Sequence, residues 1–198
     1  HSEGHKEMNL SAKELKLPTG IIVAEAHGDE EELMTHPDQL IIIDAKKEKI
    51  IKRIDLGIGD HLAHVVSDGT SAYVTATEPE LLYRIDLDSG RTHQLVLPNG
   101  SMPHGLRLTT DNKTAIIAGM GGDLFLVDLE SKNITTIPLP GKGVQTGVAG
   151  DMILTTVFDT KQLAVYDRTM KSLSLIDLPG SVGPVQVYQT QDNAFAYV

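Results

Sequence analysis

The sequence predicts an all-β fold, a β-propeller built from four-stranded blades, and two repeating features predict it. An Asp ends an apolar strand at intervals of 42, 42 and 39 residues, at Asp44, Asp86, Asp128 and Asp167. A Leu closes the next strand at intervals of 41, 42 and 39 residues, at Leu56, Leu97, Leu139 and Leu178. A period of roughly 40 residues with four strands in each unit is typical of propeller blades.

Short strands separated by turn residues fill the chain from residue 21 to residue 198. Hairpin turns are expected at residues 45–48, 68–69, 88–90 and 111–112, where Asp, Asn, Gly or a run of charged residues interrupts the apolar pattern. Aromatic residues make up only 4% of the chain and Trp is absent, so Val, Ile, Leu and Thr must fill the core, which favours strands. A parallel α/β fold would need helices of ten or more residues between strands, and no segment fits one.

The first 20 residues are polar and form a leader distinct from the propeller at residues 21–198. A short helical turn is expected from Ser11 to Leu17, with Ser11 as the cap and Glu14 three residues later. Pro18 and Gly20 would end this turn.

Composition excludes several classes of function. The 17 Lys and Arg against 27 Asp and Glu give a net charge of −10, which disfavours nucleic-acid binding. The chain has no Cys, which excludes disulfides, zinc–thiolate sites and Cys nucleophiles and fits an oxidising compartment. No segment approaches the roughly 20 apolar residues of a transmembrane helix. Because the nucleophile elbow, the phosphate-binding loop and the dinucleotide fingerprint are also missing, we expect no enzymatic activity.

The candidate ligand-binding residues enter the innermost strand of each blade, because propeller ligands bind at the central channel. In chain order these entries are His61, His104, residues 145–146 and Val185. His61 and His104 are expected to occupy matching places in neighbouring blades, where two imidazoles could bind Zn or Cu or one could act as a general base. The alternative is that the His residues only pack against neighbouring backbone.

A second polar position is expected further along the innermost strand. His64 is expected to match Arg107 of the next blade, so that both line the channel and Arg107 can hold an anion there. The alternative is a solvent-filled channel with polar walls. An acidic loop containing His27, residues 29–32 and His36 could bind Zn or Ca, although a run of acidic residues is more often only solvated.

The segment PHGLRLTTDNKTAIIAG at residues 103–119 resembles the YVTN-type β-propeller repeat. In that repeat Pro-His-Gly precedes the innermost strand, a tight turn follows, and the third strand ends in Asp. Pro103, His104 and Gly105 match it, and the segment SAYVT at residues 71–75 is close to its name-giving motif. The resemblance covers residues 21–198 and implies a seven-bladed ring. Similar propellers include surface-layer proteins, nitrous-oxide-reductase-like proteins and streptogramin-lyase-like enzymes, and most are extracytoplasmic, either periplasmic or secreted.

The chain supplies about four and a half blades of such a ring. Since open end blades would leave unpaired strand edges, we expect a fragment, a ring completed by another chain, or a smaller ring. The expected function is a non-enzymatic, extracytoplasmic scaffold that presents a rigid face to a protein or small-molecule ligand. The alternative is a Zn- or Cu-binding protein or metal-dependent enzyme with its site at the channel mouth. A lyase similar to the streptogramin-inactivating propellers would need a His/Glu pair there, which the sequence does not complete.

Overall fold

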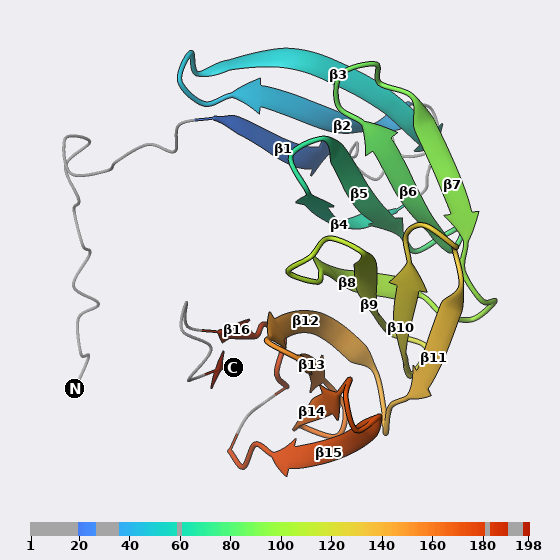
Figure 1. Cartoon of the computed structure of the whole chain (residues 1–198), viewed down its shortest axis with the longest axis vertical. Helices are drawn as coiled ribbons and strands as arrows, with labels where there is room; N and C mark the ends of the chain where they lie inside the picture. Colours follow the sequence, from blue (N-terminus) through green and yellow to red (C-terminus); the bar gives the residue numbers. More distant parts are fainter. Residues whose placement is uncertain (1–19, 27–35, 59–60, 181–182, 190–195) are drawn as a thin grey trace, which may run out of the picture.

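A computed structural model of the protein describes residues 20–26, 36–58, 61–180, 183–189 and 196–198, and every element in these ranges is a strand. The expected leader and its helical turn lie outside the described residues. In the part that the structure describes, no helix is long and apolar enough to cross a membrane. The sheets follow one another along an open arc (Figure 1).

The strands group into blades that we number in chain order. The first blade contains β1 (Ile21–Ala26), β2 (Pro37–Asp44) and β3 (Lys49–Ile58). The second contains β4 (Leu62–Ser67), β5 (Ser71–Ala76), β6 (Leu81–Asp86) and β7 (Thr92–Val96). The third contains β8 (Pro103–Leu108), β9 (Thr114–Gly119), β10 (Asp123–Asp128) and β11 (Ile134–Pro138). The fourth contains β12 (Gly143–Ala149), β13 (Met152–Val157), β14 (Gln162–Asp167) and β15 (Ser172–Asp177), and β16 (Tyr188–Gln189) pairs with β17 (Ala196–Tyr197).

Consecutive strands of each blade pair antiparallel, which confirms the predicted hairpin turns at residues 45–48, 68–69, 88–90 and 111–112. In the second to fourth blades, the first strands β4, β8 and β12 lie on the concave side of the arc. The last strands β7, β11 and β15 lie on its convex side (Figure 1). The first strands therefore form the wall where a propeller has its channel.

The repeated Asp is a turn residue, as its position predicted. In each blade its Oδ1 accepts a hydrogen bond from a backbone N–H two or three residues later. The bonds from the residue three positions later run from Lys47 to Asp44 (3.0 Å), Ser89 to Asp86 (2.7 Å), Ser131 to Asp128 (2.6 Å) and Met170 to Asp167 (2.9 Å). Hydrogen bonds from the backbone and hydroxyl of Ser131 lower the pKa of Asp128 from its usual value. The carboxylate thus replaces backbone partners that a tight turn cannot supply.

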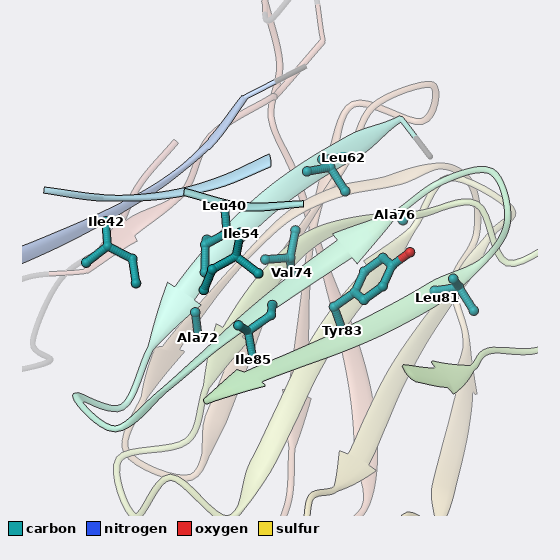
Figure 2. Packing of buried hydrophobic residues seen from close by; sticks show 10 residues of the cluster. All are labelled: Leu40, Ile42, Ile54, Leu62, Ala72, Val74, Ala76, Leu81, Tyr83 and Ile85. Atoms are coloured by element: carbon teal, nitrogen blue, oxygen red, sulfur yellow. The ribbon is translucent and has the colours of Figure 1, made fainter. Parts of the chain in front are cut away.

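The hydrophobic core lies between neighbouring blades. Figure 2 shows Leu40 and Ile54 of the first blade packed with Val74 and Ile85 of the second. Val74 belongs to the core between the first and second blades, whereas the preceding residue, Tyr73, belongs to the core between the second and third. Alternate side chains of a strand point to opposite faces, so a strand between two blades is buried on both faces. All six residues of β5 are accordingly buried.

Hydroxyl groups also join neighbouring blades. Thr75 Oγ1 donates to the carbonyl oxygen of His104 at 2.8 Å, from the second blade to the third. Thr156 has the same position in β13, and its Oγ1 donates to the carbonyl oxygen of Val185 at 3.3 Å. Both hydroxyls are buried, so these bonds are made where water cannot replace them.

We predict opposite effects for two Thr→Val substitutions of nearly equal shape. Thr75→Val should lower the free energy of unfolding by about 1 kcal/mol, because it removes the hydrogen bond to His104. Thr155→Val should raise it by about 1 kcal/mol, because the Thr155 hydroxyl is buried without a hydrogen-bond partner among the described residues. Urea unfolding of both variants measures the difference, and equal effects would contradict the assignment.

Candidate functional site

Three first strands carry a β-bulge at the same place. In β4, Leu62 pairs with Ala76 and His64 with Thr75, so Ala63 is extra. The register of β8 shifts likewise between Pro103 and Leu106, and that of β12 between Gly143 and Thr146. The equivalent bulge pairs are residues 63–64, 104–105 and 144–145. Because bulges re-aim side chains and are frequent next to binding sites, these pairs are the strongest candidates on the channel wall.

The predicted matching of His61 with His104 and of His64 with Arg107 is wrong by two residues. Pairing aligns Leu62 with Pro103, since each faces the last residue of its second strand. His61 is therefore equivalent to Met102, and the two share a left-handed backbone with φ of 46° and 43°. By the same register Arg107 is equivalent to Val66. The spacing of 43 that aligns the His residues is that of the second strands β5 and β9, whereas the first strands β4 and β8 are 41 residues apart.

The imidazole that lies against His104 is that of His64. The two ring centroids are 5.0 Å apart and the rings meet edge to face at 73°. Both side chains are half-buried, whereas His61 is exposed and precedes β4. The bulges thus bring together one His from the second blade and one from the third.

Gln145 of the fourth blade determines which nitrogen of His64 carries the proton. Gln145 Oε1 accepts a hydrogen bond from the Thr146 backbone N–H at 3.0 Å, which fixes the orientation of the amide. Its Nε2 therefore faces His64 Nε2, at 3.2 Å. An amide nitrogen can only donate, so His64 Nε2 accepts and the proton of the neutral ring is on Nδ1.

His104 has the same tautomer for a different reason. Its Nδ1 lies 2.9 Å from the carbonyl oxygen of Val144, which can only accept, so Nδ1 carries the proton. In the neutral ring this leaves the lone pair of Nε2 available, and Nε2 has no hydrogen-bond partner among the residues that the structure describes. His104 can therefore accept a proton or a hydrogen bond at Nε2.

Gly105 allows β12 to lie this close to β8. A Cβ atom at Gly105 would be 2.6 Å from both the Gln145 Cα and the Val144 carbonyl oxygen. Contacts this short cannot be accommodated without moving the backbone. The Gly of the Pro-His-Gly motif is thus required by the approach of the next blade, which supplies both residues that orient the imidazoles.

Arg107 supplies a positive charge near the imidazoles. Its side chain is half-buried and its Nη1 donates to the carbonyl oxygen of Leu106 at 3.0 Å. Within the described ranges the recorded ion pair is Lys47–Asp44, so Arg107 has no carboxylate partner there. Burial, followed by the charges of His104 and Arg107, lowers the pKa of His64 to about 4. At neutral pH the site therefore combines a guanidinium with a neutral His64.

The described residues do not supply a complete set of metal ligands. No group of three or more His, Cys, Asp or Glu side chains in these ranges could hold a metal ion. The structure places His36 on the surface just before β2, and His27 with residues 29–32 lies outside the described residues. His64 and His104 come from neighbouring strands, but Nε2 of His64 is already bound by Gln145. The sequence predicts residues 145–146 as an entry to an innermost strand, but it does not predict the contact of Gln145 with His64, which depends on the bulge register.

We predict that His64 makes the stability of the protein pH-dependent. The unfolded state, with a His pKa of 6.5, binds more protons than the folded state, with a pKa of about 4. The stabilising contribution is complete above pH 6.5 and is lost as the pH falls from 6.5 through 4. His64→Gln should therefore show a flatter dependence of melting temperature on pH between 4 and 6.5 than the unsubstituted protein. His93→Gln, at an exposed position, is the control and should retain the original slope.

Comparison with protein-family models and with curated protein sequences found no match for this chain. Among solved structures, selenomethionine-substituted virginiamycin B lyase from Staphylococcus aureus is similar, with a TM-score of 0.69 and 16% identity over 88% of this chain. A streptogramin B lyase has a TM-score of 0.70 and 17% identity over 89% of this chain. Hydrazine synthase from Kuenenia stuttgartiensis has a TM-score of 0.66 and 17% identity over 80% of this chain.

These structures extend beyond the part that the chain matches. The chain spans 66%, 60% and 48% of their lengths, in the same order, which is less than two thirds of each. At such low identity the likeness concerns the fold alone. Together with the antiparallel sheets along the arc, it shows that the chain has a β-propeller fold.

Proposed function

We propose that this chain is part of an extracytoplasmic propeller of the YVTN type that binds a ligand at the channel wall formed by β4, β8 and β12. The ligand is a small anion or an acidic group of a protein partner. The observation that carries the proposal is Arg107, half-buried and without a described carboxylate partner, next to two imidazoles placed by bulges. A charge in this setting favours an external anion as its partner.

The two tautomers indicate what else the ligand carries. His64 offers its Nδ1–H as a donor, because Gln145 occupies its Nε2. His104 offers the lone pair of Nε2 as an acceptor, because Val144 occupies its Nδ1. A ligand with a carboxylate for Arg107 and a hydroxyl for His104 would satisfy these groups. A hydroxycarboxylate is the simplest compound of this kind.

The proposed location rests on the sequence. The Pro103-His104-Gly105 motif and the segment at residues 71–75 resemble the YVTN repeat, whose members are mostly periplasmic or secreted. The chain contains no Cys, which is compatible with an oxidising compartment. In such a protein the rigid blades would serve as a scaffold, and the channel wall would provide specificity.

We predict that lactate binds at the channel wall and that Arg107→Gln weakens its binding about tenfold, because one charge-assisted hydrogen bond is lost. NMR titration of the ¹⁵N-labelled protein should show saturable shifts of the Gln145 side-chain amide. Arg91→Gln removes an equal charge at an exposed position outside the channel and should change the affinity less than twofold. Unsaturable shifts, or equal affinities of the Arg107→Gln and Arg91→Gln variants, would refute the proposal.

Binding of Zn or Cu is the second candidate function, and the orientation of His104 favours it. A metal-binding His commonly donates its other ring N–H to a carbonyl oxygen, as Nδ1 of His104 does to Val144. The imidazole of His104 would be one ligand, and further ligands would have to come from elsewhere. Calorimetric titration with Zn²⁺ and with Cu²⁺ should then show uptake that His104→Ala abolishes and His93→Ala leaves intact. Undiminished uptake by His104→Ala would exclude the channel as the metal site.

A further inference from the structure

A hollow lies between the second and third blades, beside β6, β7 and the end of β10. It is on the outer strands rather than on the channel wall, and we call it the outer hollow. Its volume is about 160 Å³. Its floor is apolar, since Tyr73, Leu82 and Val127 are buried and line it. Its rim includes the basic residues Arg84 and Lys132. The hollow therefore combines a compact apolar surface with positive charge.

The polar residues of this hollow depart from the repeat. In the second blade the cross-strand row of the second, third and fourth strands reads Tyr73, Arg84, His93. The equivalent row of the first blade is Val23, Ile42 and Lys52. That of the third blade is Ile116, Leu126 and Thr135, and that of the fourth is Leu154, Val165 and Ser174. The first two positions are apolar in each of those rows, so neither the Arg nor the Tyr hydroxyl is a requirement of blade construction.

The corresponding space between the first and second blades is filled. Lys52 occupies the position equivalent to His93, and its Nζ donates to the carbonyl oxygen of Asp88 at 2.6 Å, in the turn of the next blade. The shorter His93 lines the hollow instead, together with Leu129 of the equivalent turn. The hollow thus exists because a small number of side chains in one blade differ from those of its neighbours.

The charges at the rim are available to a ligand. Arg84 donates through Nε to Ser71 Oγ at 3.3 Å, and neither it nor Lys132 forms an ion pair within the described residues. Asp128 also lines the hollow, but its Oδ1 already accepts hydrogen bonds from the backbone and hydroxyl of Ser131. Two basic side chains therefore line the hollow beside one carboxylate, whose Oδ1 is already bonded within its own turn.

We propose that this hollow binds a small monocarboxylate with a compact apolar body, either an aromatic ring or a branched aliphatic group. The apolar body would lie on Tyr73, Leu82 and Val127, and the carboxylate would lie between Arg84 and Lys132. The size is appropriate, because an apolar cavity of about 150 Å³ in another protein accommodates a benzene molecule. The outer hollow differs from the channel wall in that its surface favours an apolar body over a second hydrogen-bonding group.

Benzoate is the probe that tests this proposal. Titration of the ¹⁵N-labelled chain should produce saturable shifts of backbone amides in β6, β7 and the end of β10. Arg84→Gln should weaken benzoate binding about tenfold, because one charge-assisted contact is lost. Benzyl alcohol, which has the same ring without the charge, should bind the unsubstituted protein more weakly by a similar factor. A thermal melt of each variant shows that it is folded.

Two matched variants separate this hollow from other basic positions. Arg91→Gln removes an exposed Arg that does not line the hollow, and it should leave benzoate affinity within twofold. Arg107→Gln should do the same, because Arg107 lies on the channel wall. The proposal is overturned if benzoate shifts amides elsewhere, if its binding does not saturate, or if Arg84→Gln and Arg91→Gln weaken it equally.

Discussion

The site on the channel wall depends on the close approach of β12 to Gly105. Because this residue has no side chain, the β12 backbone can lie where a Cβ atom would be 2.6 Å from Gln145 Cα and the Val144 carbonyl oxygen. That backbone then brings the Gln145 amide to His64 and the Val144 carbonyl to His104. A single missing side chain in one blade therefore determines the tautomers of two imidazoles, one of them in a different blade.

Two kinds of position can be distinguished in the blades. The Asp at the end of each third strand accepts hydrogen bonds within its own turn, and each of the four blades numbered above has one. His64, Gly105 and Gln145 share one bulge position, yet they differ from blade to blade. A residue that repeats satisfies a requirement of the fold. A polar residue that varies at a shared position has no such requirement, which makes it a candidate for function.

The fold was predictable because its determinants are local. Asp44, Asp86 and the turns at residues 68–69 and 111–112 specify strand ends and hairpins through short-range hydrogen bonding, so their spacing reveals the period. The alignment of the candidate residues was not predictable in the same way. The turn between β8 and β9, at residues 109–113, is two residues longer than the turn between β4 and β5, at residues 68–70. The first strands of these blades are therefore 41 residues apart and the second strands 43, and aligning His61 with His104 applied the second spacing to the first strands. The outer hollow was also not predictable, because its walls come from two blades and its opening depends on the reach of Lys52 compared with His93.

The net charge of −10 affects the two candidate sites in the same way. The long-range field of the chain repels anions, but at physiological ionic strength this field decays over about 8 Å. An anion must therefore be held by direct contact with a nearby cation, and Arg107 and Arg84 can each provide one. Their surroundings then decide which anion is preferred. The oriented imidazoles beside Arg107 favour an anion that also forms hydrogen bonds, whereas the apolar floor beside Arg84 favours one that buries hydrocarbon. The same cationic group can thus select different ligands, because selectivity comes from the neighbouring residues rather than from the charge.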